Sequence, residues 1–243
     1  MDKKLTKAET CAEVYRHYFL PGEVCEIRAY GLSRSNKAWE GWAGGNGIVY
    51  GYFNNPEDFG LCAAALDDAK AEGIYFTLNP VTPDALARAV NRLKASGPKT
   101  VCTQDKEIRI IRWLPVDIDP VRLSGISSTT DELKSALGLR NKIIQWVETN
   151  YKWDQWIAAC SGNGSHVTFR LPQDQPNTPE TTEKIKRALV AISKAFTNAQ
   201  NQVDLIVYNP SHIWKLYGTV ARKGDHTEIR PHRRSYIQKV HLR

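Results

Sequence analysis

Short apolar segments alternate with longer amphipathic segments along most of the chain, and this alternation limits the possible folds more than any other feature of the sequence. A chain that alternates strands and helices packs them in layers, so the pattern predicts a mixed α/β or an α+β fold. We expect helices near residues 7–19, 57–71, 83–93, 131–150 and 179–198, and strands near 24–30, 48–53, 74–78, 110–119, 156–159, 165–171, 203–208 and 213–220.

One predicted strand ends in two acids that flank a single apolar residue. Asp117 and Asp119 lie on either side of Ile118 and precede Pro120. Residues two apart on a strand project from the same face, so these carboxylates lie side by side. Each raises the cost of ionising the other, and a divalent cation such as Mg²⁺ or Mn²⁺ removes that cost. A strand that runs into a solvated turn is the alternative, and the acid pair alone does not decide between the two.

A histidine begins another predicted strand, directly after a turn that contains two glycines. The turn is Ser161–His166, and apolar residues alternate with polar ones beyond it, which places His166 on the polar face. Gly162 and Gly164 allow the backbone to approach a ligand closely and leave amide groups available to a phosphate. A polar-face histidine is also an ordinary surface residue, so both interpretations stay open.

A third acid interrupts an apolar run. Asp204 is the only charged residue of the segment Val203–Tyr208. A charge in such a setting is rarely buried unless it is paired or bound to a metal. Asp204 is therefore either a partner of a Lys or Arg residue or a metal ligand.

Basic residues gather after the last predicted strand. Lys215 precedes a glycine and a threonine, and residues 222–243 hold seven Lys or Arg residues against two acids, in a chain of net charge +7. Such a cluster attracts phosphates, which suits a triphosphate or a DNA backbone. A solvated tail is the alternative.

The order of these motifs along the chain resembles the archaeo-eukaryotic primase superfamily. The likeness is strongest to the primase-polymerase domains found in replication proteins of phages, plasmids and other mobile elements. The matching segments are Leu114–Asp119, Ser161–His166 and Val203–Asp204, together with Gly73–Pro80 and Lys215–Asp225, and the resemblance spans about residues 73–235. One departure is Gly164, which stands where many members carry a serine, while Ser165 comes next.

The resemblance implies an α+β fold, in which an RRM-like antiparallel or mixed sheet backed by helices (residues 106–243) packs on a smaller α/β module (residues 1–105). It implies a DNA primase and DNA polymerase, a nucleotidyltransferase that builds primers and extends strands on single-stranded DNA. Asp117, Asp119 and Asp204 would hold two Mg²⁺ or Mn²⁺ ions for phosphoryl transfer, and His166 would contact the triphosphate.

The resemblance also suggests the remaining contacts and partners. We expect nucleotide or phosphate contacts from Ser161, Gly164, Ser165, His166, Lys215, Arg222 and Lys223, and DNA contacts from Arg122, Arg230, Arg233 and Arg234. Single-stranded DNA and nucleoside triphosphates are the expected partners. No GxxxxGK[ST] motif is present, so we expect unwinding to come from a partner helicase or from a region beyond this sequence.

Two other functions fit the same motifs. A metal-dependent nuclease would use the same carboxylates on a phosphodiester. A non-catalytic replication initiator would bind single-stranded DNA through the basic segment and through stacking on Trp39, Trp42, Trp153 and Trp156.

Composition narrows the class of protein. The five cysteines are scattered singly without a CxxC pair, which argues against a disulfide framework or a four-cysteine zinc site. No segment approaches the ~20 apolar residues needed to span a bilayer, and the first residues lack the apolar core of a signal peptide. We expect a cytoplasmic protein with no membrane partner.

Overall fold

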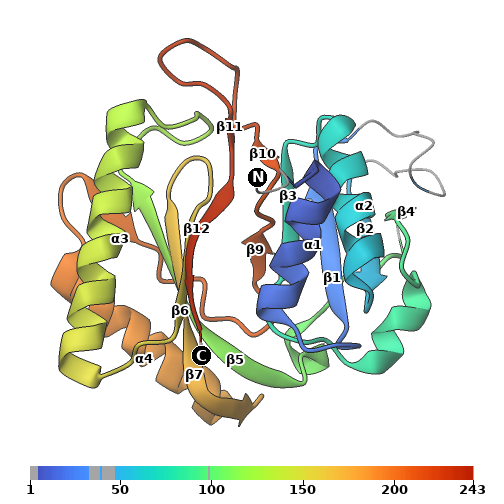
Figure 1. Ribbon diagram of the computed structural model, residues 1–243, viewed down its shortest axis with the longest axis horizontal. Helices are drawn as coiled ribbons and strands as arrows, with labels where there is room; N and C mark the ends of the chain where they lie inside the picture. Colours follow the sequence, from blue (N-terminus) through green and yellow to red (C-terminus); the bar gives the residue numbers. More distant parts are fainter. Residues whose placement is uncertain (1–4, 33–38, 40–46, 98, 243) are drawn as a thin grey trace. The chain divides into compact units, whose positions relative to one another are not determined.

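A computed structural model describes residues 5–32, 39, 47–97 and 99–242. The chain divides into two compact units, and both contain a sheet and helices, which confirms the expected α+β class. The first unit is Met1–Arg109 with Ser211–Val220, and the second is Ile110–Pro210 with Ala221–Arg243. This division differs from the expected one, because residues 106–109 and 211–220 belong to the first unit (Figure 1).

The first unit is built on an antiparallel sheet whose strand order is β4-β2-β1-β3-β9. Aromatic side chains fill its core: the Phe59 ring contacts the rings of Tyr15, Phe53 and Phe76 at centroid distances of 5.6–6.3 Å. The elements are α1 (Lys7–Tyr18), β1 (Cys25–Tyr30), β2 (Val49–Phe53), α2 (Pro56–Asp68), β3 (Gly73–Thr77), η1 (Pro83–Arg88), β4 (Lys94–Ala95), η2 (Asp105–Glu107) and β9 (Ile213–Lys215).

The second unit is built on an antiparallel sheet whose strand order is β12-β6-β7-β5-β8. Its first six elements follow the βαββαβ pattern, the split arrangement that an RRM-like core requires. They are β5 (Ile110–Pro120), α3 (Thr130–Tyr151), β6 (Trp156–Cys160), β7 (Ser165–Pro176), α4 (Pro179–Phe196) and β8 (Asn201–Val203), and β10 (Val220–Ala221), β11 (Arg233–Arg234) and β12 (Tyr236–His241) follow.

Local sequence signals explain where the helices of this unit begin. Thr129 caps α3 in a reciprocal capping box with Glu132, and Thr178 caps α4 directly before Pro179. Side-chain caps satisfy amide groups of the first turn that have no partner inside the helix, and proline suits the first helical position.

The two faces of the second sheet have different residues. Val116, Ile118, Val167 and Phe169 alternate along β5 and β7 and are fully buried. Ser165 lies on this same face and donates its hydroxyl hydrogen to the Ala136 carbonyl of α3 at 2.8 Å, so this is the face that α3 covers. The residues between them, which include both acids of β5, therefore lie on the opposite face.

Three expected elements were wrong in part. The helix expected over residues 83–93 is the 3₁₀ helix η1, which ends at Arg88, and Asn91 adopts the left-handed conformation at φ 47°. The strand expected over 203–208 ends at Val203, and the strand expected over 213–220 is divided into β9 and β10. Within the described residues, none of the helices is both long and apolar enough to cross a membrane.

Candidate active site

Three neighbouring strands bring the motif residues onto one face of the second sheet. Asp117 on β5 pairs with His166 on β7. On the other side of β5, Ile118 pairs with Val203, and the Asp204 amide donates to the Asp117 carbonyl at 2.9 Å. Asp204 therefore continues the register directly opposite Asp117. Residues opposite one another on antiparallel strands share a face, so His166 and Asp117 lie side by side across β7 and β5, while Asp204 follows the last residue of β8 and lies level with Asp117 on the other side of β5.

The histidine of this row lies against the central acid. His166 Nε2 is 3.3 Å from Asp117 Oδ1, and the imidazole is 5% exposed. The Asp117 side chain is more accessible, at 21% exposed. The imidazole therefore covers one side of the Asp117 carboxylate and leaves part of it open to a ligand.

Asp119 lies two residues further along β5, and its surroundings disfavour the ionised form of its carboxylate. Burial raises the pKa of Asp119, and the neighbouring Asp117 raises it further, while Arg122, His166 and Lys223 act in the opposite direction. Arg122 supplies the direct contacts, at 3.4 and 3.5 Å from its two terminal nitrogens to Asp119 Oδ1. The nearby cations therefore do not offset the cost of ionising this acid.

The donor set suits a hard divalent cation only in part. Asp117 and Asp119 supply adjacent carboxylate oxygens, the ligand type that Mg²⁺ and Mn²⁺ prefer. The Asp204 carboxylate instead accepts a hydrogen bond from the Ile206 amide at 2.9 Å, which turns the chain at the end of β8. Accordingly, the described part of the chain holds no group of three or more His, Cys, Asp or Glu side chains placed to share one ion.

The turn before His166 packs closely against the acids. Ser161 and Gly164 close it with two hydrogen bonds, of 2.9 Å to the serine hydroxyl and 3.1 Å between backbone groups. A Cβ at Gly164 would lie 2.6 Å from the Ile118 carbonyl oxygen and 3.0 Å from Asp119 Oδ1. A serine would therefore clash here, which explains why this chain has glycine at the position where the resembling family often has serine.

Gly162 also lies where a side chain would clash with neighbouring residues. A Cβ at this residue would lie 2.8 Å from the Ala221 side chain and 3.0 Å from the Arg233 carbonyl oxygen, and its φ is 101°. Asn163, between the two glycines, accepts a hydrogen bond from the Ser128 amide at 3.0 Å. The close approach expected for these glycines is made to other parts of the second unit.

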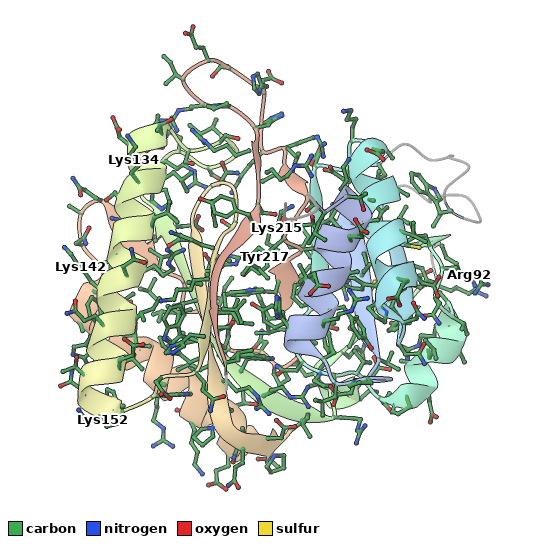
Figure 2. All side chains as sticks on the ribbon, viewed as in Figure 1. Arg92, Lys134, Lys142, Lys152, Lys215 and Tyr217 are labelled. Atoms are coloured by element: carbon green, nitrogen blue, oxygen red, sulfur yellow. The ribbon has the colours of Figure 1, made fainter. Side chains whose placement is uncertain are left out.

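Ser165 is not brought to the acid cluster. It is fully buried on the helix-covered face, where its hydroxyl binds α3. Lys215 belongs to the first unit: it is 5% exposed, donates to the Val220 carbonyl at 3.3 Å and lies 5.7 Å from the centroid of the Tyr75 ring (Figure 2). The cluster described here is built from the second unit alone.

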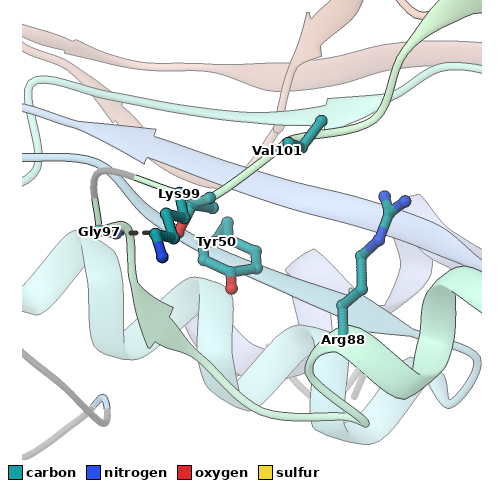
Figure 3. A pocket seen from close by; sticks show the side chains of 6 residues that line it. Tyr50, Arg88, Gly97, Lys99 and Val101 are labelled. Carbon is teal, nitrogen blue, oxygen red and sulfur yellow. Dashed lines mark hydrogen bonds between the residues drawn. The ribbon is translucent and has the colours of Figure 1, made fainter.

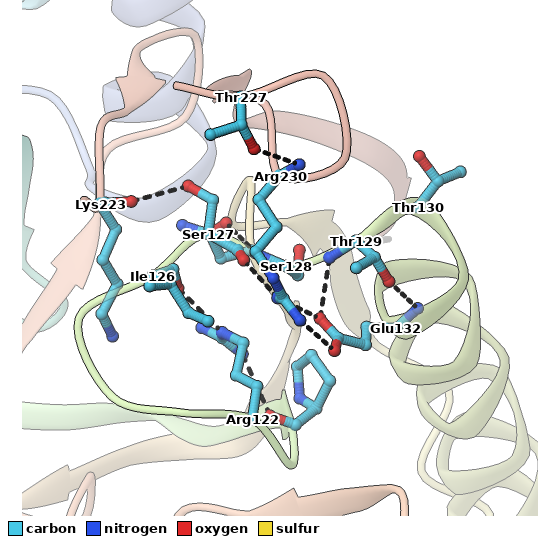
Figure 4. Close-up of polar contacts among 12 residues, drawn as sticks. Arg122, Ile126, Ser127, Ser128, Thr129, Thr130, Glu132, Lys223, Thr227 and Arg230 are labelled. Atoms are coloured by element: carbon cyan, nitrogen blue, oxygen red, sulfur yellow. Dashed lines mark hydrogen bonds and ion pairs between the residues drawn. The ribbon is translucent and has the colours of Figure 1, made fainter. Parts of the chain in front are cut away.

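Two of the expected DNA-binding arginines are engaged within the protein, and Figure 4 shows the contacts of one of them, Arg230. Arg230 makes a two-pronged ion pair with Glu132 at 2.9 and 3.0 Å and donates to the Ser127 carbonyl at 2.7 Å. Arg233 donates to the Ser128 carbonyl at 2.7 Å. We call these contacts the C-terminal clasp. It ties the basic segment to the start of α3, and Arg230 lowers the pKa of Glu132.

The other basic candidates differ in exposure. The Arg122 side chain is 6% exposed and donates to the carbonyls of Pro120 and Ile126 at 3.1 and 3.2 Å, besides its contact with Asp119. Lys223 is exposed, its charge acts on Asp119, and its carbonyl accepts from the Ser127 hydroxyl at 2.9 Å. Arg222 is half-buried and Arg234 is exposed. Arg122 and Lys223 are therefore the cations associated with the acid pair.

Three of the four tryptophans proposed for base stacking are buried or hydrogen-bonded within the protein. Trp39 and Trp156 are each 6% exposed, and the Trp156 indole donates to Glu148 at 2.7 Å. The Trp153 indole donates to the Arg170 carbonyl. Trp42 lies outside the described residues.

Glu132 and Asn163 were missed by the sequence analysis. The spacing of Thr129 and Glu132 marks a capping box, but nothing in it indicates an ion pair with Arg230, 98 residues further along the chain. Asn163 could be recognised only as part of a turn.

No protein-family model matches the chain, and no curated protein matches its sequence. Among solved structures, it is similar to the polymerase domain from Mycobacterium tuberculosis Ligase D in complex with DNA, with 13% identity and a TM-score of 0.47 over 94% of this chain and 80% of that chain. At this identity and TM-score the similarity carries no functional argument.

Proposed function

We propose that this chain is a metal-dependent nucleotidyltransferase, a DNA primase-polymerase that builds primers and extends strands on single-stranded DNA. The observation that supports it best is the position of Asp117 on β5 between His166 on β7 and Asp204 directly after β8, with Asp119 two residues along β5. These residues come from three motifs far apart in the sequence, and the motifs follow the order of the family that the chain resembles.

The acids would hold the metal. Asp117 and Asp119 provide the paired carboxylates, and Asp204, opposite Asp117, is the proposed third ligand. When bound, Mg²⁺ or Mn²⁺ supplies Lewis acidity that lowers the pKa of a 3′-hydroxyl and offsets charge at the α-phosphate.

The surrounding residues would bind and orient the nucleotide. Arg122 and Lys223 place positive charge beside Asp119. The negative charge of a bound triphosphate would offset this positive charge. His166 would donate a hydrogen bond to a phosphate oxygen from its position against Asp117. Arg222 is a further proposed contact to the nucleotide phosphates, and Arg234 is the proposed contact to the DNA backbone, which would position the strand without reading its sequence.

Substitution of the acid pair tests the proposal. Asp117→Asn, Asp119→Asn and the double variant should lower extension of DNA by at least about 100-fold, because neutral amides do not hold the metal. Added Mn²⁺ should raise the melting temperature of the parent protein, since a ligand that binds only the folded state stabilises it. The double variant should lose most of that rise. Asp131→Asn is the matched control, because the Asp131 side chain is 96% exposed, and it should retain both properties.

The outcome that rejects the proposal is synthesis by the double variant at the parent's rate. The same reactions separate the alternatives. Cleavage of the labelled strand without incorporation of nucleotides would identify a nuclease, and metal-independent binding without synthesis would identify a replication initiator.

A further inference from the structure

The first unit contains a pocket of about 720 Å³, lined by Tyr50, Arg88, Gly97, Lys99, Thr100 and Val101 (Figure 3). This volume is within the range of small-molecule sites, about 300–1,000 Å³. Its walls come from β2, from the end of η1 and from the segment after β4. All six residues belong to the first unit, so the pocket is built without any residue of the acid cluster.

The charged groups that line this pocket are cations. Arg88 and Lys99 both line it, and the lining set contains no acid. Lys94 lies close by and donates to the Arg88 carbonyl at 3.3 Å. Glu107 is paired with Arg88 and its pKa is lowered by that contact, so these two charges offset each other and the excess positive charge comes from Lys99 and Lys94. A ligand that carries negative charge is therefore favoured.

Arg88 is held in a fixed position. Its Nη1 donates to the Tyr52 hydroxyl at 3.1 Å and to Glu107 at 3.3 Å, its Nη2 also binds Glu107, and the guanidinium lies 5.6 Å from the centroid of the Tyr52 ring. The Nε hydrogen has no acceptor among the residues that the structure describes. A guanidinium fixed in this way loses little freedom when it donates to a ligand, which favours a bound oxyanion.

The remaining walls suit the ring of a nucleotide. Gly97 and Thr100 form a tight turn, with hydrogen bonds of 2.8 and 3.0 Å between them, and a Cβ at Gly97 would meet open space. Tyr50 supplies an aromatic surface and Val101 an apolar one that is 51% exposed. Figure 3 shows Arg88 on the opposite side of Tyr50 from Lys99.

We propose that this pocket binds a nucleotide unit, with a phosphate on Lys99, its base or sugar against Tyr50 and Val101, and a second acceptor group on Arg88 across Tyr50. The unit is either a free nucleotide or part of a nucleic-acid strand, since both present the same phosphate and ring. The proposal does not depend on the proposed function, because the acid cluster takes no part in it.

Calorimetric titration in the presence of EDTA tests the proposal, because it removes metal-dependent binding. The probes are adenosine, adenosine monophosphate and a short oligothymidylate. The parent protein should bind adenosine monophosphate more tightly than adenosine. Lys99→Glu should weaken binding of the phosphorylated probes by at least about tenfold, since a charge-assisted contact becomes a repulsive one. Lys134→Glu, at a side chain that is 72% exposed in the second unit, is the matched control and should change the affinity less than twofold.

Amide hydrogen exchange locates the site. Bound probe should protect residues 97–101, and Val101→Asp should remove that protection in a protein with an unchanged melting temperature. Binding of the mononucleotide alone would identify the ligand as a free nucleotide, while tighter binding of the oligothymidylate would identify a strand. Equal affinity of Lys99→Glu and the parent, protection outside residues 97–101, or no binding of any probe would overturn the proposal. None of these readouts requires synthesis, so this failure is distinguishable from failure of the proposed function.

Discussion

At the scale of single residues, Asp119 shows how the candidate site differs from a structural ion pair. Its carboxylate contacts Arg122, yet burial and the neighbouring Asp117 raise its pKa. Asp174 has the opposite balance: Arg112 binds it with two hydrogen bonds and lowers its pKa. A structural acid is stabilised when ionised, whereas Asp119 destabilises the folded protein when ionised.

This difference predicts opposite pH dependences. Because the folded state holds the Asp119 proton more tightly than the unfolded state does, its contribution to stability is complete below the ordinary carboxyl pKa and is lost as pH rises through the raised pKa. Asp119→Asn should therefore raise the free energy of unfolding at pH 7, by less than about 1.4 kcal/mol for each unit of the pKa shift, because the Asp119 side chain is 35% exposed and solvent screens its charge. Urea unfolding from pH 3 to 7 measures the effect.

Asp174→Asn is the control with the opposite sign. The Asp174 contribution is present above the ordinary carboxyl pKa and is lost as pH falls through the lowered pKa, so this variant should be less stable at pH 7. If Asp119→Asn is less stable than the parent protein at pH 7, the contact of Asp119 with Arg122 outweighs the cost of ionising the carboxylate. That result would contradict the interpretation that this carboxylate destabilises the folded protein and is retained for metal binding.

At the scale of elements, the basic C-terminal segment is an ordered part of the second unit. β12 extends the sheet beside β6, and Arg140 of α3 donates to Gln238 at 2.6 Å. A solvated tail was the alternative interpretation of the basic residues 222–243, because charge alone does not distinguish it from a phosphate-binding cluster. The position of β12 depends on the C-terminal clasp and on β6, both of which are contributed by residues distant in the sequence.

The clasp predicts a stability effect. Arg230→Ala should lower the free energy of unfolding by about 1–2 kcal/mol, between the values for exposed and buried ion pairs, since both partners are about one quarter exposed. The loss should be present at pH 7 and should shrink as pH falls through the lowered pKa of Glu132. Urea unfolding of Arg230→Ala and of Lys134→Ala, an exposed control, measures it. A change equal to the control's would mean that the clasp does not hold the segment.

The strong periodic patterns located most of the elements. β5 was expected over 110–119 and is Ile110–Pro120, an apolar segment whose residues 111–116 are all buried, and the helix expected over 131–150 is α3. β8 was expected to continue to residue 208, since Leu205 and Ile206 are apolar. The Asp204 side chain instead binds the Ile206 amide, and the two apolar residues are 41% and 65% exposed. A local hydrogen bond thus overrides hydrophobic periodicity.

The candidate site was predictable only in part. The positions of Asp117 and His166 followed from strand alternation, but their pairing depends on the β5–β7 register, which no local pattern fixes. Lys215 was expected among the phosphate contacts because it lies in Lys215–Asp225, one of the segments that resemble the primase family. Its assignment to the first unit depends on the pairing of β9 with β3, a contact between residues about 140 positions apart.

At the scale of the whole molecule, the first unit includes Ser211–Val220, a segment that follows most of the second unit in the sequence. β9 pairs with β3, and Trp214, Leu216 and Tyr217 are fully buried in the first unit. The Val220 amide also donates to the buried Asp67 at 2.9 Å. A fragment of residues 1–109 would therefore lack an edge strand and part of its core.

This predicts the behaviour of two fragments. Residues 1–109 alone should fail to unfold cooperatively and should aggregate, because they expose the edge of β3 and the surface that Trp214 and Tyr217 cover. The same fragment joined through a flexible linker to residues 211–220 should regain a cooperative thermal transition. Circular dichroism during heating compares them, and cooperative unfolding of the short fragment would show that β9 is dispensable.

The late return of β9 also affects folding during synthesis. The ribosome releases residues 1–109 first, but residue 220 follows only after roughly 5–20 s at about 5–20 residues per second. During that interval the β3 edge has no β9 to pair with, and exposed strand edges are recognised by other chains and by chaperones. The nascent first unit should therefore depend on chaperones until the second unit is almost complete, and slow translation of residues 110–210 should lower the yield of folded protein.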